Sequence, residues 1–203
     1  MCGITGIFGI SDKKLVKRMA ASITHRGPDS EGYYVDENVS LGMRRLSIID
    51  LKTGDQPVYD EKKNLIIFFN GEIYNYRELR AELKKKGHKF YTEGDTEAIL
   101  HAYMEYGVEG IGKLNGMFAF AIYDQSKKKL ILARDRAGIK PLYYCVVGDS
   151  GNGGKPNDGA KLVFGSEIKA ILEYDGIERK LDKEALSSYL TYGTVLGDKT
   201  LFE

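Results

Sequence analysis

The chain has 203 residues, of which 42% are hydrophobic and 29% are charged, as in an ordinary globular protein. Its 30 basic and 29 acidic residues nearly cancel, so its charge gives no reason to expect a nucleic acid or an anionic membrane as partner. Cys2 and Cys145 lie too far apart in the sequence to indicate a disulfide framework. With no signal peptide or long apolar run apparent, the expected location is the cytoplasm.

The first feature along the chain is a cysteine directly after Met1. If Met1 is removed, Cys2 carries a thiol that titrates near about 8.5 and an α-amine that titrates near roughly 8. One residue then supplies both a nucleophile and a base, and no histidine is needed. Because many proteins have a small residue after Met1, this pattern alone leaves the role of Cys2 open.

Hydrophobic periodicity in the first half of the chain predicts alternating strands and helices. Ser11 is expected to cap the first helix, and Asn75 with Glu78 resembles a capping arrangement for the second. The elements expected here are strands over 4–9, 32–36, 39–49 and 65–69, and helices over 12–23 and 76–86.

The second half is expected to begin with a helix over 95–106 that turns Ile99, Leu100, Tyr103 and Met104 inward. Strands linked by hairpins, with helices between the groups, indicate an α+β layered domain rather than a parallel doubly wound sheet. The remaining expected elements are strands over 117–124, 129–134, 142–147 and 161–165, and helices over 166–174 and 182–191.

Two kinds of ligand site are excluded by spacing. The glycine-rich segment 148–161 is not a phosphate-binding loop, because Asp149 and Pro156 stand where that motif needs glycine and Ser or Thr. We interpret it as a loop between two strands. The three histidines are scattered, and neither HExxH nor paired CxxC spacing occurs, so no metal site is expected.

Attack of a thiolate on an amide carbonyl makes an oxyanion that needs preorganised hydrogen-bond donors. Asn70 and Gly71 can supply them through a side-chain amide and a backbone N–H, although Asn-Gly is equally the commonest hairpin turn. An amino-acid substrate would also need a cation for its carboxylate and an anion for its ammonium group. Arg44 or Arg45 and Asp95 are candidates, but each is one of 59 charged residues, most of which are simply solvated.

The sequence resembles the N-terminal glutaminase domain of the glutamine-hydrolysing asparagine synthetases, which are class II (N-terminal nucleophile) glutamine amidotransferases. The resemblance covers essentially the whole chain, and its motifs occur in the order of the family. They are Met1-Cys2-Gly3-Ile4, Arg26-Gly27-Pro28-Asp29, Arg45-Leu46-Ser47-Ile48-Ile49-Asp50, Asn70-Gly71-Glu72-Ile73-Tyr74-Asn75, Gly94-Asp95-Thr96-Glu97, and the segments 116–121, 134–144 and 164–169.

The resemblance implies a four-layer αββα sandwich with two packed antiparallel sheets, and hydrolysis of L-glutamine to L-glutamate and ammonia. By the same resemblance, Cys2 is the nucleophile, its α-amine is the base, and Asn70 and Gly71 form the oxyanion hole. The substrate carboxylate is expected at Arg45 and the substrate ammonium at Asp95, helped by Glu72. The residues expected to line the pocket through their backbone are Leu46, Ser47, Ile48 and Ile49.

In this family a synthetase domain follows the glutaminase domain, and its ATP-binding Ser-Gly-Gly-x-Asp-Ser loop is not found in this sequence. We therefore expect residues 1–180 to be the amidotransferase domain and residues 181–203 to begin the connection to that synthetase domain. No cofactor is expected for this chain, since ATP, magnesium and aspartate belong to the synthetase domain. A homodimer is possible.

Three alternatives stay open. The chain can belong to another class II amidotransferase with a different ammonia acceptor, although the segments 26–32 and 164–171 favour the asparagine synthetase branch. It can be an N-terminal nucleophile amidase that does not act on glutamine and needs neither Arg45 nor Asp95. It can also be a catalytically silent scaffold or interface domain, in which case Cys2 is replaceable without loss.

Overall fold

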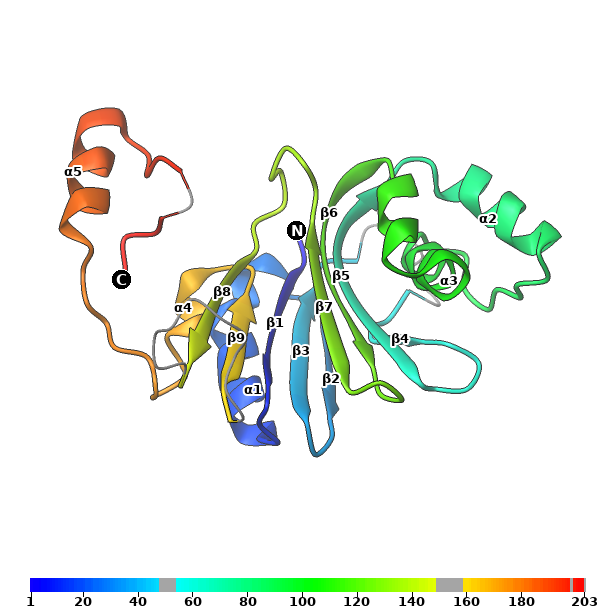
Figure 1. Ribbon diagram of the computed structural model, residues 1–203, viewed down its shortest axis with the longest axis horizontal. Helices are drawn as coiled ribbons and strands as arrows, with labels where there is room; N and C mark the ends of the chain where they lie inside the picture. The colour runs from blue at the N-terminus through cyan, green and yellow to red at the C-terminus, as the bar shows by residue number, and fades with distance from the viewer. Residues whose placement is uncertain (48–53, 149–158, 198, 203) are drawn as a thin grey trace.

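The computed structural model describes residues 1–47, 54–148, 159–197 and 199–202. Two antiparallel sheets form its centre (Figure 1). The five-stranded sheet has the order β2 (Ser30–Val35), β3 (Val39–Arg45), β1 (Gly3–Phe8), β9 (Lys161–Gly165) and β8 (Tyr143–Val147). The four-stranded sheet has the order β4 (Val58–Tyr59), β5 (Leu65–Ile73), β6 (Gly116–Asp124) and β7 (Lys129–Arg134).

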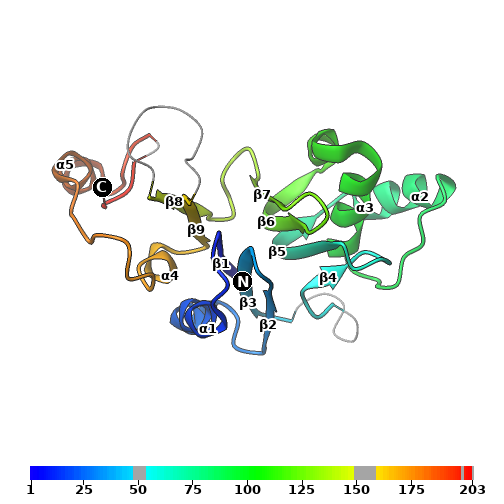
Figure 2. The same cartoon turned by 60° about the horizontal axis from the view of Figure 1, so that its bottom comes forward.

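Helices cover the outer face of each sheet (Figures 1 and 2). The five-stranded sheet packs against α1 (Lys13–Ser22) and α4 (Ile168–Ile171), and the four-stranded sheet packs against α2 (Tyr76–Lys85) and α3 (Thr96–Tyr106). Two 3₁₀ segments, Thr24–Arg26 and Gly107–Lys113, follow α1 and α3. The α+β class and the four-layer αββα sandwich are therefore confirmed.

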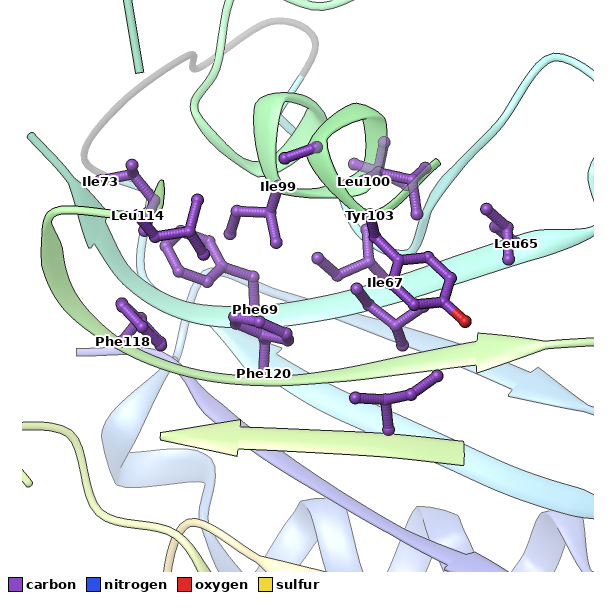
Figure 3. Packing of buried hydrophobic residues seen from close by; sticks show 14 of the residues in the cluster. Leu65, Ile67, Phe69, Ile73, Ile99, Leu100, Tyr103, Leu114, Phe118 and Phe120 are labelled. Atoms are coloured by element: carbon purple, nitrogen blue, oxygen red, sulfur yellow. The ribbon is translucent and has the colours of Figure 1, made fainter. Parts of the chain in front are cut away.

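The alternation of side chains along each strand explains the layers, because successive residues of a strand point to opposite faces. On β5, Ile66 and Phe68 face the other sheet, where they pack with Ile4 and Leu41. Their neighbours on β5 point the other way and pack under α3, as Figure 3 shows. The residues of this outer cluster labelled there are Leu65, Ile67, Phe69, Ile73, Ile99, Leu100, Tyr103, Leu114, Phe118 and Phe120. Both faces of the central strands are thus buried, and the residues at their ends are left to form a site.

Several local expectations need correction. The cap of α1 is Asp12 rather than Ser11, because the Asp12 carboxylate accepts hydrogen bonds from the backbone N–H groups of Lys14 and Leu15. Met104 is 41% exposed and does not face the core. A short strand, β4, was not expected, and it pairs with β5. The helix expected over 166–174 is a single turn, α4, and the expected strand over 39–49 ends at Arg45 as β3.

The last helix, α5 (Lys183–Tyr192), lies to one side of both sheets in Figures 1 and 2. Its N-terminus is capped by Asp182, and Ala185 is its one buried residue. Leu181 pairs with Phe202 across an isolated bridge, so the chain returns past the start of the helix. The expected division of the chain at residue 180 stays a prediction. Among the described residues, no helix is long and apolar enough to span a bilayer.

Candidate active site

The N-terminal end of β1 opens into a cavity of about 110 Å³ at one end of the inter-sheet layer. Its size is of the order of the roughly 150 Å³ cavity that accepts a benzene-sized ligand, which indicates a small molecule as its occupant. The residues that line it are Met1, Cys2, Arg45, Leu46, Gly54, Gln56, Phe69, Asn70, Gly71, Glu72, Gly94, Asp95, Thr96, Met117 and Lys140.

The register of the five-stranded sheet explains the place of Cys2. In the antiparallel pair of β1 and β3, Gly3 lies opposite Arg44, so Cys2 comes to the end of β3. There its Sγ lies 3.4 Å from the nitrogen of Leu46 and 3.6 Å from the Leu46 oxygen. The Cys2 carbonyl accepts a hydrogen bond of 2.9 Å from Arg26 Nε. The thiol is therefore held at the cavity by the backbone of Leu46, and the Cys2 carbonyl is held by the side chain of Arg26.

The Asn70-Gly71 pair is not a turn. Strand β5 continues through it to Ile73, and Asn70 and Gly71 lie opposite Ala119 and Phe118 of β6. The Asn70 side chain is buried, at 1% exposure, and its Nδ2 has no hydrogen-bond partner among the described residues. A buried amide donor without a partner is costly in a folded protein unless a ligand uses it. The interpretation of Asn70 as a donor to a bound group is thus favoured over the turn.

Gly71 is needed for the close approach of β5 and β6 at the cavity. A Cβ atom built on Gly71 would lie 2.1 Å from the Met117 carbonyl oxygen, which is far inside van der Waals contact. Any larger residue would push the two strands apart and move the backbone N–H at this position. Met117 also lines the cavity.

The structure separates the two candidate arginines. Arg45 lines the cavity, and its Nη1 lies 2.6 Å from Asp55 Oδ1, in a carboxylate that is 78% exposed. The neighbouring Arg44 points to the opposite face of β3, where it pairs with Glu31 at 2.6 Å. Of the two arginines, Arg45 is therefore the one at the cavity, and its guanidinium already pairs there with a carboxylate.

Two carboxyl groups lie together on another wall of the cavity. Asp95 precedes α3 and is buried, and its Oδ2 accepts a hydrogen bond of 2.9 Å from the backbone nitrogen of Ile73. Burial raises the pKa of the Asp95 carboxyl above its ordinary value, and the negative charge of Glu72 acts in the same direction. A positively charged ligand group would relieve both effects, so this wall fits an ammonium group.

The remaining predicted residues divide three ways. Leu46 lines the cavity, as expected. Ser47 is not among its lining residues; its backbone nitrogen donates instead to Asp29 Oδ2 at 2.8 Å. The predictions for Ile48 and Ile49 fall outside the described residues.

Lys140 is a charged cavity residue that sequence reasoning missed. It belongs to the segment 134–144, a family motif in which the sequence points to no site residue. Its side chain is 6% exposed and lines the cavity together with Cys2 and Asn70. A lysine far along the sequence carries no local signal that it will fold against the N-terminus, so only the structure could assign it to the site.

In the described ranges there is no group of three or more His, Cys, Asp or Glu residues that could hold a metal ion. His88 and His101 lie beside each other, with their Nδ1 atoms 2.9 Å apart, but each uses its Nε2 on a glutamate, Glu105 and Glu97 respectively.

Comparison with known proteins supports the resemblance. Asparagine synthetase [glutamine-hydrolyzing] 1 of Bacillus subtilis is 43% identical over 208 aligned positions, which cover 99% of this chain and 31% of that protein. Asparagine synthetase [glutamine-hydrolyzing] 2 of Oryza sativa subsp. japonica is 43% identical over 176 positions, covering 84% of this chain and 28% of that protein. The chain therefore spans about a third of the length of these relatives.

Solved structures share the fold. The glutamine phosphoribosylpyrophosphate amidotransferase of B. subtilis, complexed with ADP and GMP, superposes with a TM-score of 0.67 at 22% identity, over 83% of this chain and 42% of that one. The glutamine amidotransferase domain family matches residues 1–203. The chain thus belongs to the glutamine amidotransferase domain family, and the expected resemblance to the N-terminal part of the asparagine synthetases is confirmed.

Proposed function

We propose that this chain hydrolyses L-glutamine to L-glutamate and ammonia, and that the ammonia is used for asparagine synthesis. The observation that supports the reaction best is the shared cavity of the Cys2 thiol and the unpartnered Asn70 Nδ2. A nucleophile and a buried donor at one cavity are the two parts that acyl transfer through a tetrahedral intermediate requires.

The charged walls of the cavity fit the two ends of a free amino acid. Arg45 binds the α-carboxylate, since a guanidinium can hold a carboxylate through two parallel hydrogen bonds. Asp95 and Glu72 bind the α-ammonium group. These contacts orient the substrate so that its side-chain amide extends toward Cys2 and Asn70.

In the reaction, the α-amine of Met1-free Cys2 takes the thiol proton as Sγ attacks the side-chain carbonyl carbon of glutamine. The resulting oxyanion accepts hydrogen bonds from Asn70 Nδ2 and the Gly71 backbone N–H. The amine returns the proton to the leaving nitrogen, and ammonia departs from a thioester. A water molecule, deprotonated by the same amine, then attacks the thioester, and the proton goes back to Cys2 as glutamate leaves.

The names of the relatives suggest the wider setting. We place a synthetase domain, as the acceptor of the ammonia, in a longer protein of which this chain corresponds to the N-terminal part. ATP and magnesium would act in that domain, and we assign no cofactor to this chain. We further propose a cytoplasmic protein with no nucleic acid or membrane partner, in which a homodimer is possible.

The experiment is incubation of the Met1-free chain with L-glutamine, with glutamate and ammonia measured together. Equal amounts of both products are expected. Glutamine with its α-carboxylate blocked as an amide is the control, because it keeps the scissile amide but cannot pair with Arg45. Hydrolysis of the blocked compound at the same rate would favour an amidase that does not recognise a free amino acid. No hydrolysis of either would favour a silent interface domain.

A further inference from the structure

The turn after β7, residues 134–140, is built around one buried carboxylate. Asp135 accepts hydrogen bonds from the backbone nitrogens of Phe118, Ile139 and Lys140, at 3.1, 2.9 and 3.0 Å. Burial alone would raise the pKa of this carboxyl, but the three hydrogen bonds outweigh it and lower the pKa below its ordinary value. Asp135 therefore stays ionised and fixes the turn against β6.

The same turn is closed from its other side by Arg134. Its Nε donates to the Lys140 oxygen at 2.8 Å, and its Nη2 donates to the Gly138 oxygen at 2.7 Å. The backbone of Lys140 is thus held at its nitrogen by Asp135 and at its oxygen by Arg134. These hydrogen bonds fix the backbone of Lys140 and therefore the place from which its side chain extends.

The side chain of Lys140 is buried in the cavity, and no carboxylate among the described residues pairs with it. The polar contact of its ammonium nitrogen is with the thioether of Met1, Nζ lying 3.4 Å from Sδ. A thioether is a weak acceptor, and an unpaired buried ammonium is costly. A lysine side chain is thus buried beside the residue that is bonded to the nitrogen of Cys2.

Among the described residues, the other charged groups around Cys2 are paired with an opposite charge or lie at the proposed ammonium site. Arg45 is paired with Asp55, and the carboxyl groups of Glu72 and Asp95 lie together at the proposed ammonium site. Outside the cavity, Arg26 holds the Cys2 carbonyl, but its charge is offset by Glu167, 3.0 Å away. Glu167 also pairs with His25 and Lys169.

We propose that Lys140 is a positioning residue that acts on the catalytic base. When Met1 is absent, the Lys140 ammonium faces the freed α-amine of Cys2 and disfavours a positive charge on that amine. The amine is then kept neutral and able to accept the thiol proton. Like charges in a poorly solvated site favour the neutral form of the group that can lose its charge. This inference rests on the proposed function, in which that amine is the base.

The test is a titration of the amine itself. Met1-free protein labelled with ¹³C-cysteine gives two Cα signals by NMR, from Cys2 and Cys145, and the Cys2 signal is followed from about pH 6 to about pH 10. In Lys140→Met, the titration midpoint of the Cys2 amine is expected to move up by about one pH unit. The pH midpoint of the acid limb of kcat/KM for glutamate release should rise by the same amount, and KM should change little.

Three further variants make the result specific. Lys140→Gln is a second neutral variant, so the outcome does not depend on the folding of one protein. Lys140→Arg keeps the charge and should keep the midpoint of the parent chain. Lys84→Met removes an exposed lysine of α2 and should change nothing. The Cys145 signal checks in each sample that the fold is retained.

Either neutral variant, folded and with the midpoint of the parent chain, would overturn the inference, as would a loss confined to KM. The NMR titration needs no glutamine, so the two proposals can fail separately. A titration midpoint that depends on Lys140, in a protein that releases no glutamate, would contradict the proposed function alone. Glutamate release with an unmoved midpoint would sink the role of Lys140 alone.

Discussion

The Cys2 thiol contacts both polar backbone atoms of Leu46, with Sγ 3.4 Å from the nitrogen and 3.6 Å from the oxygen. The nitrogen can donate to a sulfur that carries negative charge, and the oxygen can accept from a protonated one. The first residue after β3 therefore holds the nucleophile in place through either state of the thiol. A substitution at Leu46 leaves these backbone atoms present, so the contact depends on the chain path rather than on a side chain.

The first prediction concerns the nucleophile. Cys2→Ala should abolish glutamate release and leave the thermal unfolding temperature nearly unchanged, because the thiol is only partly buried. Cys145→Ser is the matched control. Cys145 lies on β8, outside the cavity, and burial raises the pKa of its thiol, so it is a poor nucleophile at neutral pH. Equal loss of activity in the two variants would contradict the assignment.

Asn70→Ala tests the oxyanion hole. Removing one such donor typically lowers kcat by about 100- to 1,000-fold, and KM for glutamine should change little. Asn75→Ala is the control, since Asn75 lies outside the cavity and spends its side chain on Lys113 and Asn115. It should cost stability in chemical denaturation but not kcat. A larger effect on KM than on kcat in Asn70→Ala would assign Asn70 to ground-state binding instead.

Arg45→Ala and Asp95→Asn test the recognition of the two charged ends of the substrate. Each removes a charged partner of the substrate, and removing one member of a buried charge pair costs roughly 2–5 kcal/mol. The expected result is a large fall in kcat/KM for glutamine in both variants. Lys84→Ala, which removes an exposed charge, should behave as the parent chain. Parent kinetics in either cavity variant would mean that the substrate is not held by both ends.

The layers of the fold were predictable because strand periodicity is strong in this sequence. Leu65 to Phe69 is a continuous apolar run, which is typical of a strand buried on both sides, and in the structure Ile66 and Phe68 face one way and Ile67 and Phe69 the other. The local sequence does not show where that strand ends. Asn-Gly has the same appearance in a turn and in a strand, and here the pairing of Gly71 with Phe118 decides in favour of the strand.

The site residues that belong to a recognised motif were predictable. Those whose position depends on pairing between distant parts of the chain were less so. Arg44 and Arg45 are chemically the same, and only the alternation of β3 directs Arg45 to the cavity and Arg44 to Glu31. Ser11 and Asp12 are both good caps, and the helix uses the carboxylate of Asp12. Lys140 was missed because its contact with Met1 joins residues that lie 139 positions apart in the sequence.

A fourth prediction concerns the loop that carries Asp95. Glu97 is buried and accepts hydrogen bonds from the backbone nitrogens of Tyr91 and Thr92 and from the Thr92 hydroxyl. Burial alone would raise the pKa of Glu97, but the hydrogen bonds from His101 and from this loop outweigh it and lower the pKa to about 2. The folded state therefore binds this proton less well than the unfolded chain.

The stabilisation from Glu97 should be fully present above its ordinary pKa of 4.5 and should disappear as the pH falls toward about 2. In Glu97→Gln, the free energy of unfolding should be lower near neutral pH and should fall less steeply on acidification. Urea unfolding at about pH 6 and about pH 3 measures both. Glu109→Gln, which changes an exposed glutamate, should keep the steep dependence of the parent chain.

The last prediction concerns Met1 itself. While Met1 is present, the nitrogen of Cys2 is a peptide amide, which is not basic, and Met1 forms part of the wall of the cavity. Its Sδ also contacts Lys140 Nζ. Activity should therefore follow removal of Met1. Intact-mass spectrometry of preparations with and without methionine aminopeptidase treatment should show that glutamate release is proportional to the fraction that lacks one methionine residue.

A preparation of the same protein that keeps Met1 makes the test sharper. Aminopeptidases remove Met1 before small residues, so a preparation kept untrimmed by inhibition of that enzyme should bind glutamine weakly and release no glutamate. Subsequent trimming of the same sample should restore the rate, which excludes a folding defect as the cause. Homogeneous Met1-bearing protein that hydrolysed glutamine at the full rate would mean that the α-amine is not the base. Another group near Cys2 would then have to accept the thiol proton, and the neutral form of Lys140 would be the first to examine, since it lines the same cavity.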